Sequence, residues 1–220
     1  MAERLLAVGD IHGCFDSFRE MVENRIKLQK SDKLILLGDY IDRGYKSKEV
    51  IDYIMELTEN GYDVIPLRGN HEVMLLDAYE DEENFELWFI NGGITTLKSF
   101  NINSIFDIDS KYITFFHGLQ YFYSYEDFLF VHAGFDNFAA NPFTDYYAMT
   151  WESREYYDNP ILKNKTIIHG HKTITSYACE VSILKSRKVI NIDTGCVYKH
   201  LDGYGKLTAY DCNARKTFVV

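Results

Sequence analysis

Five short motifs in the sequence place a carboxylate, an imidazole or an amide directly after an apolar run. They are GDIHG at 9–13, GDYIDRG at 38–44, RGNHE at 68–72, VHAG at 131–134 and HGHKT at 169–173. Oxygen and imidazole ligands without thiolate suit manganese, iron or zinc, and a carboxylate shared by two ions is a usual way to hold them close together. The motifs therefore predict a metal site, with Asp39 as the candidate bridge between two ions.

Each motif has a structural explanation when it is taken alone. An aspartate after a strand, such as Asp10 or Asp39, is commonly a helix cap or a turn residue. His132 fits a hydrogen-bonded core histidine equally well. The occurrence of all five motifs at predicted strand ends, beside glycines that allow close approach of the backbone, favours one shared site over five separate structural roles.

The apolar runs before the motifs are expected to be buried strands, because they are too short for helices and consist mostly of β-branched residues, leucine and phenylalanine. The predicted strands are 5–8, 34–37, 64–67, 128–131, 166–168 and 189–192. In an open α/β sheet the binding crevice lies at the carboxyl ends of the strands, which is where the motifs fall.

Helical patterns lie between the first three strands. One apolar stripe begins at Phe18 behind a capping Asp16 or Ser17, and another covers 50–55 and ends at Asn60. The chain therefore opens as βαβαβ.

The rest of the chain is expected to add helices and a second sheet. Residues 79–125 predict helices and loops, with a helix near 85–90 and a break at 91–93. From Phe128 onward strands return without good helical patterns between most of them, which predicts a second, more antiparallel sheet. We therefore expect an α/β (α+β) fold, a four-layer αββα sandwich of two mixed β-sheets flanked by helices, in a single domain spanning 1–220.

Composition narrows the class of protein. The 220 residues are 46% hydrophobic and 15% aromatic, which is typical of an ordinary globular domain. A formal charge of −10 disfavours broad binding to nucleic acid. Four cysteines without CxxC spacing favour reduced thiols, and neither a signal peptide nor a membrane span is visible. We expect a cytoplasmic monomer with no nucleic-acid or membrane partner.

The five motifs together resemble the calcineurin-like metallophosphoesterase superfamily, and within it the phosphoprotein phosphatase branch. Length and motif spacing are similar to compact bacterial and phage Ser/Thr protein phosphatases, as are the stretches 88–93 (WFINGG) and 191–196 (NIDTGC). The resemblance covers residues 5 to about 211. It implies two divalent metal ions, with Mn²⁺ expected first and iron or zinc as alternatives.

The resemblance assigns a role to each matching position. The implied metal ligands are Asp10, His12, Asp39, Asn70, His132 and His171, with His169 the weaker candidate of the HGH pair. His71 would be the general acid and Asp42 its orienting partner. Arg43 would clamp phosphate, and Arg154, in a segment similar to the family's Trp-x-x-Arg, would be a second clamp.

Two departures from the family pattern limit the assignment. Lys172 stands directly after the last histidine, where the family usually has threonine, and we expect it to face solvent. Residues 101–125 match no motif and are expected to shape substrate choice.

The implied reaction is hydrolysis of phosphoserine or phosphothreonine in proteins, by in-line attack of a hydroxide shared between the two metals. One alternative is a symmetrical dinucleoside tetraphosphate hydrolase, because a related bacterial branch has almost the same ligand motifs. A second is a non-catalytic protein that binds phosphorylated partners, which the presence of His71, Asp42 and Arg43 disfavours.

Overall fold

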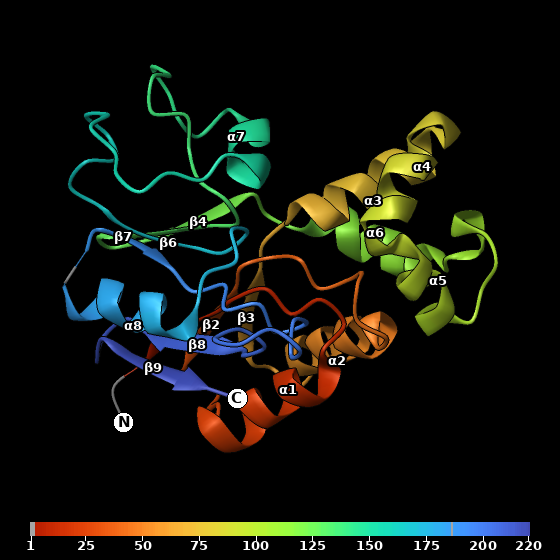
Figure 1. The fold of residues 1–220 in the computed structure, drawn as a ribbon, viewed down its shortest axis with the longest axis horizontal. Helices are drawn as coiled ribbons and strands as arrows, with labels where there is room; N and C mark the ends of the chain where they lie inside the picture. The colour runs from red at the N-terminus through yellow and green to blue at the C-terminus, as the bar shows by residue number, and fades with distance from the viewer. Residues whose placement is uncertain (1–2, 186) are drawn as a thin grey trace.

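The computed structural model describes residues 3–185 and 187–220, and its strands form two sheets that pack face to face (Figure 1). The first sheet has the strand order β3-β2-β1-β8-β9 and the second has the order β4-β5-β6-β7. The strands are β1 Leu5–Val8, β2 Lys33–Leu36, β3 Asp63–Pro66, β4 Phe122–Tyr125, β5 Phe128–Val131, β6 Thr166–His169, β7 Val189–Asn191, β8 Thr208–Asp211 and β9 Lys216–Val219. All six predicted strands are present, with ends that differ by one residue at most.

Both sheets are mixed. In the first, β1, β2 and β3 run parallel, and β8 and β9 continue the sheet antiparallel. In the second, β5, β6 and β7 run parallel and only β4 is antiparallel to its neighbour. The predicted antiparallel character of the second sheet is therefore wrong. Its parallel strands are connected through helices α7 and α8, which the sequence patterns did not reveal, and the antiparallel strands at the end of the chain join the first sheet instead.

Helices complete the four layers. They are α1 Phe15–Glu20 with the π-helical η1 Met21–Arg25, α2 Ser47–Glu59, α3 Asn70–Glu80, η2 Glu82–Asn84, α4 Phe85–Trp88, η3 Phe89–Gly93, α5 Ile94–Phe100, η4 Ile105–Asp107, α6 Ser110–Gly118, α7 Tyr146–Trp151 and α8 Ser176–Leu184. Figure 1 shows α1 and α2 below the first sheet, α7 above the second, and α3 to α6 grouped at one side. The predicted four-layer αββα sandwich is confirmed.

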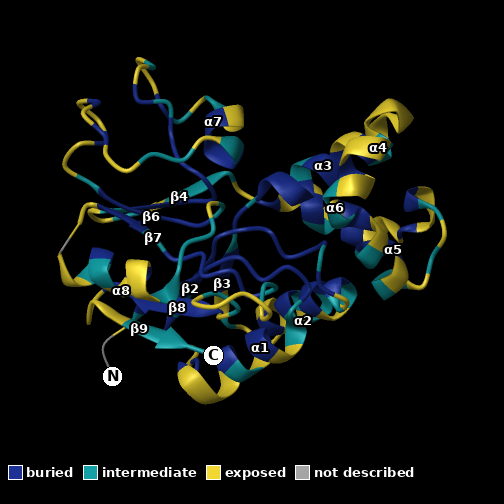
Figure 2. Ribbon diagram, viewed as in Figure 1, coloured by how far each residue is buried: buried dark blue, intermediate teal, exposed yellow. Residues whose placement is uncertain are grey.

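The side-chain alternation of the strands produces three core layers. In β1, Leu6 and Val8 pack with the helices, whereas Leu5 and Ala7 face the second sheet. In β5, Phe130 faces the first sheet, and its neighbours on either side pack in the outer layer around Met149 of α7. The central strands β1, β2, β5 and β6 are thus buried on both faces over most of their length, drawn dark blue in Figure 2, which explains their continuous apolar sequences. The edge strands β4 and β9 are only partly buried.

Two local expectations have different outcomes. The N-cap of α1 is Cys14, with no side-chain capping bond, so the predicted capping role of Asp16 or Ser17 is wrong; Asp16 pairs with Lys46 instead. The predicted break near 91–93 is confirmed as a kink at Gly92, whose φ of 115° suits glycine. Within the described residues, no helix is long and apolar enough to cross a bilayer.

The intersheet core generates a stability prediction. Phe130 is fully buried between the sheets, so Phe130→Ala is expected to lower the free energy of unfolding by about 3–5 kcal/mol, because it removes contacts on both sides and leaves a cavity. Phe130→Leu should cost less than about 1.5 kcal/mol if the core repacks around it. Denaturant unfolding measures both values. Leu184→Ala in α8, where the side chain is 82% exposed, is the control and should stay within about 0.5 kcal/mol of the parent.

Candidate dinuclear metal centre

The ends of strands from both sheets meet at one place. Asp10 follows β1, Asp39 follows β2, and Asn70 begins α3 just beyond β3. His132 directly follows β5, and His171 lies two residues beyond β6. Main-chain hydrogen bonds join the loops, among them the amide of His12 to the carbonyl of Asp39 at 2.8 Å and that of Gly170 to the carbonyl of His132 at 2.8 Å. The five motifs therefore lie together at the carboxyl ends of the strands, as the sequence predicts.

The backbone of these loops is unusual. Nine described non-glycine residues have a positive φ, and five of them are predicted site residues: His12, Asp39, Asp42, Arg43 and His171. Such left-handed conformations are costly for residues other than glycine and cluster at functional sites. The strained backbone therefore orients these side chains at a cost in local stability.

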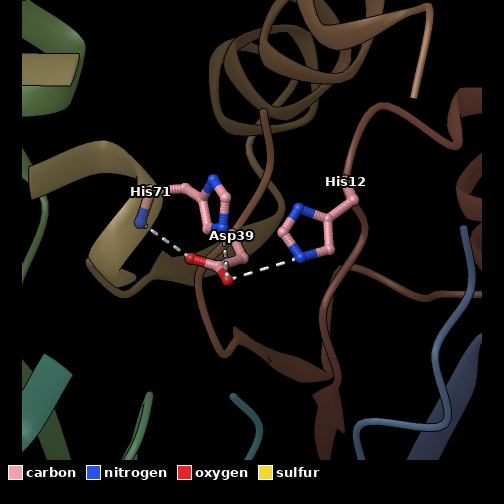
Figure 3. A group of neighbouring side chains, drawn as sticks. All are labelled: His12, Asp39 and His71. Atoms are coloured by element: carbon pink, nitrogen blue, oxygen red, sulfur yellow. Dashed lines mark hydrogen bonds and ion pairs between the residues drawn. The ribbon is translucent and has the colours of Figure 1, made fainter. Parts of the chain in front are cut away.

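The carboxylate of Asp39 lies at the middle of the group (Figure 3). Its Oδ2 is 3.4 Å from His12 Nε2, and its Oδ1 is 3.5 Å from His132 Nε2 and accepts the backbone N–H of His71 at 3.1 Å. The two oxygens thus face two different imidazoles. This is the arrangement expected of a carboxylate that bridges two ions.

The tautomers of two histidines follow from their main-chain contacts. His12 Nδ1 lies 2.9 Å from the carbonyl oxygen of Ile41, and His132 Nδ1 lies 2.9 Å from that of Leu37. A carbonyl oxygen only accepts, so each Nδ1 carries the proton and each Nε2 presents a lone pair. Both lone pairs face the carboxylate of Asp39, which also only accepts when it is ionised. Orientation by a main-chain carbonyl is typical of histidines that bind metals.

Asn70 and His171 extend the same set of acceptors. The side-chain oxygen of Asn70 lies 2.9 Å from His132 Nε2 and 3.0 Å from His171 Nδ1, and these two ring nitrogens are 3.1 Å apart. An oxygen that faces the lone pair of His132 cannot form a hydrogen bond with it. A cation shared by these atoms removes the conflict, so the donor set fits a divalent metal ion.

Asp10 supplies a second buried carboxylate. It accepts the backbone N–H of His171 at 3.1 Å, and with Asp39 and His132 it forms one group whose ligand atoms lie within 4.8 Å of one another. A Cβ at Gly170 would lie 2.0 Å from Asp10 Oδ1, so any larger residue there would displace the Asp10 carboxylate from this position. Burial, Asp193 and Asp39 raise the pKa of Asp10 well above its usual value, and a bound cation would offset that penalty.

The imidazoles are held in the neutral form that binds metal. Burial lowers the pKa values of His12 and His132, and burial together with the ring of His132 lowers that of His171 to about 4. His169 is also buried but lies outside the group; it lines a separate cavity with Arg154 and the exposed Lys172. Lys172 faces solvent, as expected.

His71 and Asp42 form a buried pair. His71 Nδ1 lies 2.7 Å from Asp42 Oδ2, and Asp42 also accepts from Thr96 Oγ1 at 2.6 Å and Trp88 Nε1 at 3.1 Å. Burial lowers the pKa of His71, but Asp39 and Asp42 oppose this and raise it above the usual value, which favours the protonated ring. Its Nε2 is buried, has no hydrogen-bond partner among the described residues, and lies 3.9 Å from Asp39 Oδ2.

This geometry leaves two roles for His71. With His12 and Asp39 it forms a second group of ligand atoms within 4.8 Å. The strong bond to Asp42 instead favours a protonated ring that donates from Nε2. We favour the donor role because a cationic imidazole cannot bind a metal ion.

The two arginines differ in position. Arg43 Nη1 is 2.8 Å from His12 Nε2, so its guanidinium reaches the centre. Arg154 pairs with Glu152 at 3.3 Å and lies over the ring of Phe138, contacts that belong to its own loop region. The structure thus brings Arg43 to the ligands, and the second clamp stays a prediction.

Glu72, the last residue of the RGNHE motif, has no role predicted from the sequence. Its buried carboxylate accepts the backbone N–H groups of Gly69 at 2.9 Å, Asp39 at 2.9 Å and Tyr40 at 2.8 Å. It therefore holds the loop that contains Asp39 and Tyr40 against the turn at Gly69, where α3 begins. Burial and the charge of Asp39 raise the pKa of Glu72 to about 7.

Comparisons with known proteins agree on the family and divide on the substrate. A zinc-dependent endopolyphosphatase of Saccharomyces cerevisiae is 33% identical over 100 residues, 45% of this chain and 29% of the relative. Serine/threonine-protein phosphatase 2 of Salmonella typhimurium is 37% identical over 86 residues, 39% of this chain and 37% of the relative. A symmetrical bis(5'-nucleosyl)-tetraphosphatase of Buchnera aphidicola is 40% identical over 77 residues, 35% of this chain and 27% of the relative. The matches thus span well under half of each relative.

Solved structures show the same fold. A protein solved as a proposed diadenosine tetraphosphatase superposes with a TM-score of 0.67 at 18% identity, over 100% of this chain and 94% of that one. A protein serine/threonine phosphatase from Saccharomyces cerevisiae gives a TM-score of 0.69 at 16% identity, over 99% of this chain and 79% of that one. The model of the calcineurin-like phosphoesterase family matches residues 3–205, and since this is most of the chain, the protein belongs to that family.

Proposed function

We propose that the protein hydrolyses phosphomonoesters, with phosphoserine and phosphothreonine side chains of proteins as its leading substrates. The observation that carries this proposal is the His71–Asp42 pair, whose free Nε2 points toward Asp39. The alkoxide of serine or threonine is a strongly basic leaving group, so its departure needs a proton from a positioned acid. The relative from Salmonella typhimurium is a protein phosphatase by name, which agrees with this choice.

Six side chains would hold the two metal ions: Asp10, His12, Asp39, Asn70, His132 and His171. Oxygen and nitrogen donors without sulfur suit Mn²⁺ first, with iron or zinc as alternatives. When bound, the ions would place positive charge beside the phosphoryl oxygens, and they would lower the pKa of a bound water enough to supply hydroxide near neutral pH.

The protein's own residues perform the remaining tasks. Arg43 offers two parallel N–H donors to the phosphoryl oxygens and stabilises the charge that develops on them in the transition state. His71 delivers the proton of Nε2 to the leaving oxygen, and Asp42 keeps the ring oriented and cationic until then. Arg154 is proposed as a second donor to phosphate at the rim, with the HGHKT segment beside it.

A symmetrical dinucleoside tetraphosphate hydrolase is the second candidate. The Buchnera aphidicola relative carries that activity in its name, and a cavity beside Arg43 is lined by Phe15, Tyr45 and Tyr198, rings of the kind that stack on a nucleobase. Parallel rates on a phosphothreonine peptide, diadenosine tetraphosphate and an aryl phosphate, with manganese present, discriminate the two. Faster turnover of the dinucleotide than of the peptide would reject the protein phosphatase assignment.

The ligand set predicts the metal content. Protein loaded with Mn²⁺ and then desalted should hold two ions per chain by elemental analysis, because the donor atoms form two groups around Asp39. Asp39→Asn should lower both the stoichiometry and the turnover, since the bridging charge is lost. One ion per chain in the parent, retained with full activity in Asp39→Asn, would exclude the dinuclear centre.

Arg43 should act on phosphate binding. Arg43→Ala is expected to weaken substrate binding and inhibition by inorganic phosphate together, by about tenfold or more if a charge-assisted pair worth about 1.5–3 kcal/mol is lost. Arg43→Lys should recover only part of the effect, because lysine lacks the planar fork. Steady-state kinetics with phosphate as inhibitor give both numbers. Unchanged phosphate inhibition in Arg43→Ala would instead assign the residue a structural role beside His12.

The role of His71 can be decided by leaving-group dependence. His71→Asn should keep both metal ions and slow a phosphothreonine peptide by about 10²–10⁴-fold, but slow an aryl phosphate with an acidic phenol much less. Asp42→Asn should show the same dependence in weaker form, because the imidazole remains. Loss of a metal ion from His71→Asn, or an equal slowing of both substrates, would move His71 into the metal shell.

A further inference from the structure

A cavity of about 590 Å³ lies beside the metal centre. Its walls come from three separate segments of the chain, 13–17, 43–46 and 197–200. Arg43 belongs to both places, because it lines the cavity and its Nη1 lies 2.8 Å from His12 Nε2. The cavity therefore adjoins the position proposed for the scissile phosphate at Arg43.

The walls of this cavity are cationic although the chain as a whole carries a charge of −10. Arg43, Lys46 and Lys199 line it, and Asp16 is the one acidic side chain among the lining residues. Lys46 Nζ pairs with Asp16 at 2.6 Å, whereas the polar contact of Lys199 Nζ is with Ser17 Oγ at 3.4 Å. With three cationic side chains and one carboxylate, the lining carries an excess of positive charge, although the charge of Lys199 also acts on Asp16.

A cationic hollow with low-dielectric walls focuses an electrostatic field and concentrates anions. The aromatic rings between the cations supply such walls: Arg43 lies 6.0 Å from the centre of the Tyr198 ring, and Tyr45 is 78% exposed at the edge. When one phosphoryl group binds at the metal centre, Lys199 has no anionic partner from the substrate, and Lys46 has only Asp16 of the protein itself. The charge pattern therefore exceeds what a single phosphate monoester requires.

We propose that this cavity binds a second anionic group, carried on the same molecule as the scissile phosphate. The group is an acidic side chain next to the phosphorylated residue of a peptide, or a further phosphate of a nucleoside polyphosphate. Both present oxygen anions to Lys199 and Lys46. The inference rests on the proposed hydrolysis of phosphoesters, but not on the choice between peptide and dinucleotide.

A charge-neutralising variant tests the cavity. Two phosphothreonine peptides are compared, one with two glutamates beside the phosphothreonine and one with two glutamines. Each is tested on the parent and on the cavity variant Lys46→Gln/Lys199→Gln. The control variant is Lys98→Gln/Lys216→Gln, whose two lysines are exposed outside the cavity. We expect the parent to prefer the glutamate peptide by about fivefold or more in kcat/KM, from one extra charge pair at contact distance. The preference should vanish in the cavity variant, persist in the control, and shrink as salt is added. Turnover of an aryl phosphate should stay unchanged in both.

A binding measurement separates this effect from chemistry. The same peptides are titrated calorimetrically into Mn²⁺-loaded His71→Asn, with and without the two cavity substitutions. Without the cavity substitutions, the Kd of the glutamine peptide should exceed that of the glutamate peptide by the same factor as the preference in kcat/KM. With them, the two Kd values should be equal. Diadenosine tetraphosphate forms the other arm, and the cavity variant should hydrolyse it more slowly than the control does.

The outcomes distinguish the two proposals. If only the dinucleotide is hydrolysed, and the cavity variant slows it, the protein phosphatase assignment fails and the second anionic subsite stands. If a glutamate preference persists in the cavity variant, the subsite is wrong. It is also wrong if the parent shows no such preference and the variant hydrolyses diadenosine tetraphosphate at the control rate.

Discussion

Lone pairs that face one another in a buried place are the constraint on which the rest of this structure depends. His12 and His132 each commit Nδ1 to a main-chain carbonyl, so both present Nε2 to Asp39. Buried acceptors that face one another are costly unless a donor or a cation lies between them. Arg43 Nη1, 2.8 Å from Nε2, serves His12 in this way, whereas Nε2 of His132 faces the oxygens of Asp39 and Asn70. The left-handed backbone of the loops and the glycine at 170 serve that convergence, because neither would be favourable in an ordinary turn.

Packing of the two sheets offsets the cost of this arrangement and holds the strand ends rigidly. The three parallel strands of each sheet deliver their carboxyl ends to one edge, and the intersheet core fixes the distance between the sheets. Glu72 then connects adjacent loops through three main-chain N–H groups, which otherwise would be buried without acceptors. The carboxylate of Glu72 thus helps to determine where that of Asp39 lies.

The sequence predicted those features that local patterns determine. Strands buried on both faces have continuous apolar runs, so all six predicted ones are present, and residue types after the runs identified Asp10, Asp39 and His132 as candidates. Contacts between distant residues left no such pattern. Trp88 and Thr96 hold Asp42 from 46 and 54 residues away, and nothing in their neighbourhood indicates that partner. The direction of the second sheet was missed for a similar reason, because α7 and α8 lack a clear apolar stripe.

The distribution of charge explains why the centre depends on cations to recognise phosphate. Burial raises the pKa of Asp10, and Asp193 and Asp39 lie close enough for their charges to raise it further, on a chain with a formal charge of −10. Such a field repels a phosphate dianion, and one guanidinium from Arg43 cannot reverse it alone. Two divalent ions would invert the sign of the local field, while the carboxylates that bind them keep the surroundings negative. The metal centre would then attract anions, and the cationic wall that begins at Arg43 lies beside it. Recognition of the substrate would thus depend on the position of its negative groups as well as on their number.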